Sequence, residues 1–188
     1  MVAVIDYGVG NLFSLKSSLA AIGQEAVVTR DQEELDRADH ILLPGVGAFG
    51  DAVKKLRSTG MDRAVLRQAA AGKPLLGICL GMQLLFETSF EYGEHQGLGL
   101  ISGQVRDIGS VLPSGLAVPH MGWNSLQLTE KGKKHPLFKY SKEGDYVYFV
   151  HSFYGKDCDE SLLATSEYGI PVTASAANEN VMGCQFHP

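Results

Sequence analysis

A cysteine flanked by glycines is the residue of this chain whose neighbours best suit it for chemistry. Cys79 lies in Gly77-Ile-Cys79-Leu-Gly81, after the apolar run Leu75–Ile78 and before an apolar stretch that continues to Phe86. This pattern predicts a strand that turns directly into a helix at the cysteine. The glycines permit the sharp, strained turn of a nucleophile elbow, which points the central side chain outwards. The pattern therefore predicts a thiol nucleophile.

The residues after the cysteine would support the same chemistry. A helix that begins here directs the positive end of its dipole at the sulfur, which favours the thiolate. The backbone N–H of Leu80 would point to the place where an oxyanion forms on a carbonyl that the sulfur attacks. Gln83 lies one helical turn further on and on the same face, where its amide would reach a bound substrate.

A structural role explains Cys79 about equally well from spacing alone, because free cysteines are commonly buried and the glycine motif is short. The other two cysteines are weaker candidates. Cys158 lies among acidic residues, which disfavour a thiolate. Cys184 alternates with the apolar Met182 and Phe186, which predicts that it packs in the core.

Two histidines are candidates for the base that a thiol nucleophile needs. His151 ends the apolar run Tyr146–Val150, and His187 follows the run Val181–Phe186. The ends of strands are where the active sites of α/β sheets gather. A hydrogen-bonded structural histidine is the alternative for each, so these residues alone leave the choice open.

A glycine-rich loop, Pro44–Gly50, follows another apolar run and contains the pattern GxGxxG. A dinucleotide-binding loop is one interpretation, but the pattern follows the third expected strand and no strand ending in an acidic residue comes about 20 residues later. The alternative is a loop whose free N–H groups receive an oxyanion beside Cys79. The position of the loop favours this second interpretation.

The elements that must hold these residues alternate between strands and helices in the first half of the chain. We expect strands at Val2–Asp6, Glu25–Thr29, His40–Leu43 and Leu75–Ile78, and helices at Leu12–Ile22, Glu33–Ala38 and, broken near Gly60, Phe49–Ala71. Continuous apolar strands that alternate with helices indicate a parallel sheet covered on both faces. After about residue 100, short strands separated by turns indicate antiparallel pairing.

Length and composition limit what else the chain does. Its 188 residues, 45% hydrophobic and 20% charged, predict one globular domain spanning 1–188. A net charge of -5 argues against nucleic-acid binding, and the densest basic cluster, Lys131–Lys134, is short enough to be a solvated turn. The longest apolar run falls short of the ~20 residues that span a bilayer. An odd number of cysteines without CxxC argues against disulfide or zinc scaffolds, so we expect a soluble cytoplasmic protein without membrane partners.

Three segments, taken in order, resemble the class I glutamine amidotransferases: Pro44-Gly-Val-Gly47, Gly77-Ile-Cys-Leu-Gly-Met-Gln83 and Gly183-Cys-Gln-Phe-His-Pro188. Four more narrow the resemblance to the glutaminase subunits of imidazole glycerol phosphate synthases: Asp6–Leu12, Gly97–Ile101, Pro119–Asn124 and Tyr148–Ser152. The resemblance implies a flavodoxin-like α/β fold, with a central mostly parallel sheet, helices on both faces and additional antiparallel strands in the second half.

The resemblance implies that the site is the active site of a glutaminase. Cys79 would attack the side-chain amide of glutamine, giving a γ-glutamyl thioester and ammonia, with His187 as general base and acid. The oxyanion would be held by Leu80 together with Gly45, Val46 and Gly47. Glutamine would be bound by Gln83, His151, Ser152 and Phe153. The chemistry implied needs no metal and no cofactor.

The resemblance also implies a partner, a (β/α)8-barrel cyclase subunit in a heterodimer. The residues that would face it are Asn11, His120, Met121, Trp123 and Asn124. Ammonia is largely protonated in water and then is no nucleophile, which is a physical reason to pass it directly to the partner. The cyclase would use it to make imidazole glycerol phosphate and aminoimidazole carboxamide ribonucleotide in histidine biosynthesis.

One departure from the family pattern bears on catalysis. The family pattern continues His-Pro-Glu, with the Glu orienting the imidazole, whereas this sequence stops at Pro188. We expect that the chain is truncated and that the 188-residue form is a poor glutaminase. The alternatives are a glutaminase subunit of another synthase, a non-catalytic interaction subunit, and a thiol redox domain. Alkylation of Cys79 by a glutamine analogue, blocked by glutamine, would separate a glutaminase from the last two.

Overall fold

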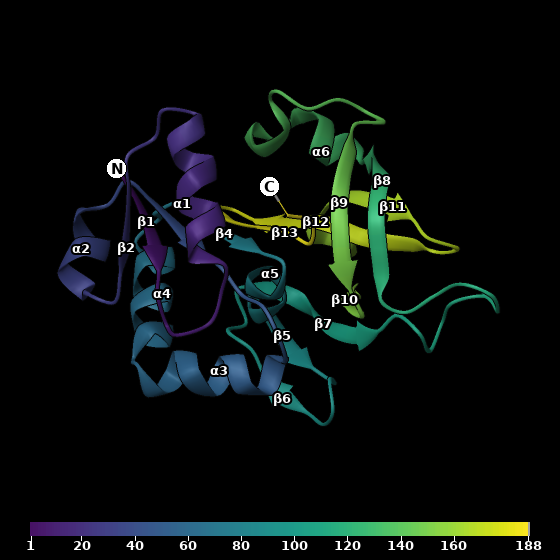
Figure 1. The fold of residues 1–188 in the computed structure, drawn as a ribbon, viewed down its shortest axis with the longest axis horizontal. Helices are drawn as coiled ribbons and strands as arrows, with labels where there is room; N and C mark the ends of the chain where they lie inside the picture. The colour runs from purple at the N-terminus through teal and green to yellow at the C-terminus, as the bar shows by residue number, and fades with distance from the viewer. Residues whose placement is uncertain (188) are drawn as a thin grey trace.

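The computed structural model describes residues 1–187, and its centre is a nine-stranded sheet (Figure 1). The strand order is β2-β1-β3-β4-β13-β12-β11-β8-β9. Neighbours from β2 to β13 pair in parallel, and neighbours from β13 to β9 pair antiparallel. The strands of the sheet are β1 (Val2–Ile5), β2 (Ala26–Thr29), β3 (His40–Leu43), β4 (Leu75–Ile78), β8 (His120–Leu128), β9 (Tyr146–His151), β11 (Leu162–Glu167), β12 (Pro171–Asn178) and β13 (Val181–Cys184).

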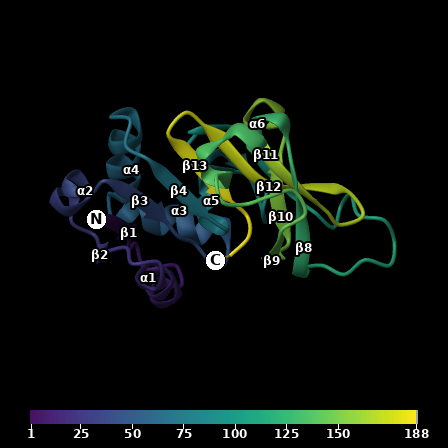
Figure 2. The ribbon, with the colours of Figure 1, turned by 90° about the horizontal axis from the view of Figure 1, so that it is seen from above.

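Helices cover both faces of the parallel strands. Ile41 and Leu43 face the core formed with α2, α3 and α4, whereas Leu42 between them faces α1. Figure 2 shows α1 and α4 on opposite sides of these strands. The helices are α1 (Leu12–Ala21), α2 (Gln32–Arg37), α3 (Phe49–Ser58), α4 (Met61–Ala70), α5 (Leu80–Leu84) and α6 (Glu130–Lys134). The predicted parallel, doubly covered arrangement is confirmed.

Local signals in the sequence set several helix ends. The side-chain oxygen of Asn11 accepts a hydrogen bond from the backbone N–H of Ser14 at 3.2 Å and so caps α1. Gly60 separates α3 from α4 with a φ of 73°, a conformation that glycine adopts without strain. The predicted break near Gly60 is therefore confirmed.

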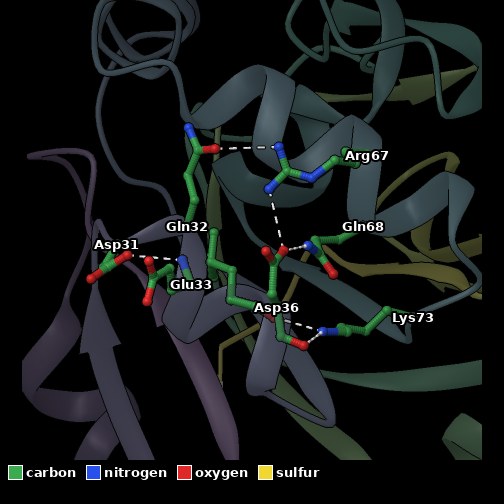
Figure 3. Close-up of polar contacts among 8 residues, drawn as sticks. Asp31, Gln32, Glu33, Asp36, Arg67, Gln68 and Lys73 are labelled. Atoms are coloured by element: carbon green, nitrogen blue, oxygen red, sulfur yellow. Dashed lines mark hydrogen bonds and ion pairs between the residues drawn. The ribbon is translucent and has the colours of Figure 1, made fainter.

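Polar contacts join α2 to α4 at the surface (Figure 3). The guanidinium of Arg67 donates to Asp36 Oδ1 at 3.2 Å, and the Gln68 amide donates to the same oxygen. The Lys73 ammonium donates to the carbonyl oxygens of Leu35 and Asp36, at 2.6 and 2.9 Å, near the end of α2. Cations are favourable there because the last carbonyls of a helix lack intrahelical partners.

The second half contains the expected antiparallel strands and also a second sheet, of order β10-β7-β5-β6. In this sheet β5 and β7 pair in parallel, and the two outer pairs are antiparallel. Its strands are β5 (Phe86–Ser89), β6 (His95–Gln96), β7 (Ile101–Asp107) and β10 (Phe153–Lys156). Two short 3-10 helices, Pro136–Phe138 and Asp159–Ser161, complete the elements.

Two elements differ from expectation. The helix after Cys79 ends at Leu84, and Phe86 begins a strand, because the Leu85 carbonyl accepts the backbone N–H groups of Leu100 and Ile101 instead of continuing a helical ladder. An apolar run alone does not distinguish these outcomes. Lys131–Lys134 lies in α6 and not in a turn, since the Thr129 hydroxyl caps the helix through the Gly132 N–H. Within residues 1–187, no helix is long and apolar enough to cross a membrane.

Candidate active site

The site forms where parallel strands end together. Ile78 and Cys184 are paired across β4 and β13, so the next residues, Cys79 and Gln185, emerge side by side at the carboxyl edge of the sheet. Leu43 of β3 pairs with β4 on its other side, which brings the loop after β3 to the same edge. Carboxyl edges of this kind are where α/β sheets bind ligands.

Cys79 occupies a strained turn, as the elbow pattern predicts. Its backbone φ angle is 56°, in the left-handed region that residues other than glycine rarely adopt. A Cβ on Gly81 would lie 1.9 Å from the Leu43 carbonyl oxygen, so glycine is required where the elbow meets β3. A Cβ on Gly45 would lie 2.7 Å from the Gly81 nitrogen. The expected approach of the glycine-rich loop to the elbow is therefore confirmed.

Cys79 opens into a cavity of about 350 Å³. The cavity is lined by Val46, Gly47, Cys79, Leu80, Gln83, Glu91, Pro119, Val150, His151, Ser152, Phe153 and His187. His187 is held there by its backbone N–H, which donates to the Tyr148 carbonyl of β9 at 3.0 Å. The structure thus brings together the predicted nucleophile, both candidate bases and the predicted glutamine-binding residues, while Gly45 lies in an adjoining groove.

The thiol of Cys79 is protonated in this environment, contrary to the expected thiolate. The side chain is buried, and this burial raises the pKa of the thiol to about 11. The Leu80 N–H and the Gln185 amide, whose Nε2 donates to Sγ at 3.7 Å, offset part of the increase. Because α5 has five residues, its dipole is small compared with the cost of a buried charge.

Within residues 1–187, the imidazole of His187 makes no hydrogen bond, whereas that of His151 makes two. Both ring nitrogens of His151 are engaged, Nδ1 with the Phe153 carbonyl and Nε2 with His120 Nδ1, each at 2.9 Å. Burial lowers the pKa of His151 to about 4 and also lowers the pKa of His187. Both imidazoles are therefore neutral at pH 7, and His187 lines the same cavity as Cys79.

The comparisons with known proteins agree with this arrangement. Residues 3–188 match the family model described as glutamine amidotransferase class-I. The chain belongs to the class I glutamine amidotransferases. The predicted family and its enzymatic activity are therefore confirmed.

Relatives of this amidotransferase include proteins described as imidazole glycerol phosphate synthase subunit HisH. The relative from Sulfurimonas denitrificans is 47% identical over 190 residues, covering 100% of this chain and 90% of its own length. The relative from Aquifex aeolicus is 47% identical over 187 residues, which cover 98% of this chain and 87% of that relative. The relative from Bacillus velezensis is 48% identical over 192 residues, covering 100% and 88%.

Solved structures share the fold of this amidotransferase. A crystal structure of a glutamine amidotransferase matches it with a TM-score of 0.75 at 19% identity, covering 100% of this chain and 90% of that one. The Trypanosoma brucei CTPS glutaminase domain with bound acivicin matches with a TM-score of 0.68 at 17% identity, covering 100% and 85%. The predicted α/β fold of the family is confirmed.

Two polar residues of the amidotransferase site were not predicted from the sequence: Glu91, which lines the cavity, and Gln185, which contacts Cys79. Glu91, 8% exposed, accepts the backbone N–H of Phe49 at 2.7 Å, and burial raises the pKa of its carboxyl group. Gln185 is completely buried and also accepts from Gln83 Nε2 at 3.0 Å. A carboxylate next to aromatic residues and a glutamine before a histidine give no signal by themselves. The Gln83 amide also donates to the Phe153 carbonyl at 3.0 Å, so it is tied to protein groups in this structure.

The residues expected to face a partner divide into two groups. Met121 and Trp123 are 59% and 67% exposed, and Asn11 is exposed beside the adjoining groove. His120, in contrast, is completely buried between the rings of Phe149 and Tyr168, and Asn124 is partly buried. The expectation that the His120 side chain itself faces a partner does not match this structure, because β8 turns alternate side chains inwards.

Proposed function

We propose that this chain is the glutaminase subunit of an imidazole glycerol phosphate synthase, which hydrolyses glutamine to glutamate and ammonia. The observation that carries the proposal is a strained cysteine that shares a cavity with a neutral histidine, in a chain 47% identical to HisH subunits over its whole length. Glutamine-dependent synthesis of imidazole glycerol phosphate and aminoimidazole carboxamide ribonucleotide, a step of histidine biosynthesis, is the function that follows.

In the proposed mechanism, His187 takes the thiol proton as Cys79 Sγ attacks the side-chain carbonyl carbon of glutamine. The tetrahedral oxyanion accepts hydrogen bonds from the Leu80 N–H and from the loop that contains Val46 and Gly47. His187 then gives its proton to the departing nitrogen, which leaves as ammonia. A water molecule, deprotonated by His187, hydrolyses the thioester to release glutamate. No residue in this scheme requires a metal or cofactor.

Glu91 supplies the group that recognises the free amino-acid end of the substrate. One of its oxygens accepts the Phe49 N–H, and its carboxyl group lines the cavity that holds Cys79. Glutamine carries an α-ammonium group, which a partly desolvated carboxylate binds strongly. This contact would distinguish free glutamine from glutamine within a peptide chain. The partly buried Ser152 and Phe153 line the same cavity.

A groove of about 340 Å³ adjoins the cavity and suits the exit of ammonia towards a cyclase subunit. The groove shares Val46, Val150 and His187 with the cavity and reaches Asn11 on α1. Exposed Trp123 stacks edge-on against Tyr148, which also lines the groove. Exposed aromatic side chains of this kind are common anchors of protein interfaces. We place the (β/α)8-barrel partner over this groove, with both proteins in the cytoplasm.

The decisive experiment combines labelling with a coupled assay. A chloroketone analogue of glutamine should alkylate Cys79, as located by peptide mass spectrometry, and glutamine should protect it. Cys79→Ala should abolish both labelling and glutamate release, while Cys158→Ala is the matched control because Cys158 is also buried but lies outside the cavity. Glutamate release should rise when the cyclase subunit and its nucleotide substrate are added.

Two results would overturn the proposal at different levels. Labelling that glutamine does not block would remove the glutaminase assignment. Glutamine-protected labelling combined with activation by an anthranilate synthase partner, but not by the cyclase, would keep the glutaminase and change its pathway.

A further inference from the structure

Two buried histidines, His120 and His151, lie at the cavity. His151 lines it, and the proposed mechanism gives His120 no role. His120 and His151 face each other across β8 and β9, with His120 Nδ1 2.9 Å from His151 Nε2. His120 is completely buried, and its ring stacks on Phe149 and Tyr168 with centroid distances of 4.7 and 4.0 Å. It does not line the cavity, so any effect that it has on substrate passes through His151.

The hydrogen-bond partners fix which nitrogen of His151 carries the proton. The Phe153 carbonyl oxygen only accepts, so His151 Nδ1 must be protonated to bond to it at 2.9 Å. In neutral His151 the other nitrogen, Nε2, then holds a lone pair and needs a donor. His120 Nδ1 faces that lone pair, so His120 must carry a proton on Nδ1.

The far side of His120 tolerates either of two arrangements. His120 Nε2 lies 3.0 Å from the side-chain oxygen of Asn124, whose nitrogen donates to the Glu167 carbonyl at 3.2 Å. With this amide orientation, His120 carries a second proton. With the Asn124 amide rotated, its nitrogen donates to a neutral His120, which burial favours, since burial lowers the pKa of His120. In both arrangements His120 Nδ1 donates to His151 Nε2.

From His151 a continuous set of hydrogen bonds leads to the nucleophile. The Phe153 carbonyl accepts from His151 Nδ1 and also from Gln83 Nε2, at 2.9 and 3.0 Å. Gln83 Nε2 donates as well to the Gln185 side-chain oxygen at 3.0 Å, and Gln185 Nε2 donates to Cys79 Sγ at 3.7 Å. The orientation of His151 therefore bears on the orientation of the amide that contacts the thiol.

We propose that His120 is a positioning residue for the glutaminase reaction: by donating to His151 Nε2 it holds the Nδ1-protonated ring in place against the Phe153 carbonyl, which fixes that carbonyl and, through Gln83 and Gln185, the Cys79 thiol. The inference rests on the proposed glutaminase activity for its kinetic consequence but not for its tautomer. The polar pair occupies a buried place where two apolar side chains would cost less desolvation energy, which is expected if it positions the site.

The tautomer is tested directly by ¹⁵N nuclear magnetic resonance of histidine-labelled protein. We expect the His151 signals to show a protonated Nδ1 and an unprotonated Nε2 at pH 7.5, and the His120 signals to show a protonated Nδ1. His120→Phe keeps the aromatic stack but removes the donor, so the His151 Nε2 signal should shift, because its lone pair loses its hydrogen-bond partner. Unchanged His151 signals in this variant, or a protonated Nε2 in the wild-type protein, would overturn the proposal.

The kinetic consequence is measured with the cyclase subunit present. His120→Phe should lower kcat for glutamine hydrolysis about 10-fold, a size typical of lost supporting contacts in metal sites. His120→Asn should restore most of the loss, because its amide nitrogen replaces Nδ1 as a donor to His151. Tyr168→Phe is the matched control: it changes a ring stacked on His120 but no link to Cys79, and it should keep the wild-type kcat.

The outcomes separate failure of this inference from failure of the proposed function. If the protein, extended at its C-terminus through the glutamate of the family pattern, does not hydrolyse glutamine with any partner, the proposed function fails, and the ¹⁵N signals still decide the tautomer. If the wild-type protein is active and His120→Phe matches it in kcat and in thermal stability, His120 has no positioning role. Equal losses of kcat in the Phe and Asn variants would also overturn the proposal, since they would indicate a packing effect.

Discussion

The parallel and antiparallel halves of the sheet contribute different kinds of group to the site. The parallel half carries its candidate chemistry in the turns after β3 and β4, where Cys79 and the Gly45–Gly47 loop lie at the edge of a largely apolar core. The antiparallel half instead buries polar rings within its strands, among them His120 and His151. One half therefore supplies the proposed nucleophile, and the other holds neutral imidazoles near it. They meet at β13, which is parallel to β4 and antiparallel to β12.

The largest expected effect tests whether the base comes from the end of β13. His187→Asn should lower the rate of glutamine hydrolysis by about 100- to 10,000-fold, the usual contribution of general acid–base catalysis. The rate is measured as glutamate release with the cyclase subunit present. His40→Asn, which changes an exposed histidine of the parallel half, should leave the rate unchanged. Retention of more than a tenth of the rate by His187→Asn would move the base elsewhere in the cavity.

The buried imidazoles of the antiparallel half should make the protein sensitive to acid. The pKa of His151 is about 4 in the folded protein against 6.5 as a model value, so the unfolded chain binds protons that the folded protein does not. The free energy of unfolding should therefore fall as pH decreases from about 6.5 to about 4, by on the order of 3 kcal/mol from His151. His120 and His187, whose pKa values burial also lowers, act in the same direction.

This acid effect is measured by urea unfolding at several pH values. His151→Gln should flatten the decrease relative to the wild-type protein, while His40→Gln should not. A wild-type unfolding free energy that stays constant from pH 6.5 to 4.5 would contradict the neutral state of His151.

Glu91 is a buried polar group that belongs to neither half of the large sheet. It lies in the loop after β5, a strand of the second sheet. Glu91→Gln removes the charge that we assign to the α-ammonium group and should raise KM for glutamine about 10-fold, with kcat little changed, since that contact is equal in ground and transition states. Steady-state kinetics separates the two constants. Glu94→Gln, at an exposed neighbouring position, is the control. A fall in kcat without a change in KM would assign Glu91 to the chemical step instead.

The smallest effect concerns the outer helices of the parallel half. Arg67→Ala breaks the exposed contacts of Arg67 with Asp36 and Gln32 and should cost less than about 1 kcal/mol of unfolding free energy. Urea unfolding at low and high salt measures it, with Arg63→Ala as an exposed control on the same helix. A loss of several kcal/mol would show that surface contacts, and not the apolar core, hold α2 on α4.

The difference between the parallel and antiparallel halves also explains which parts of the site can be predicted from the sequence. Gly77, Cys79 and Gly81 predict the elbow because the turn depends on residues next to one another. The antiparallel strands are also recognised by their composition. What remains hidden is which polar residues they enclose: the burial of His120 depends on Tyr168, and that of Gln185 on strands on either side of β13. Contacts between distant segments leave no local pattern.

The expected thiolate was wrong for a related reason. The helix dipole is a local property that the elbow motif predicts, whereas the burial that raises the pKa of Cys79 comes from several segments that close over it. The resemblance to a family selects His187 over His151, and the hydrogen bonds of His151 give the physical reason.

The central position of β13 has a consequence for biosynthesis. Gln185 and Cys79 are 106 residues apart, so a ribosome that has made the elbow needs roughly 5–20 s more to make the strand beside it. Until then β4 and β12 present unpaired edges, and the cysteine has neither its amide contact nor its histidine. If Cys79 and His187 act as proposed, a growing chain releases no ammonia before its sheet closes, and its open edges are the surfaces that chaperones would need to cover.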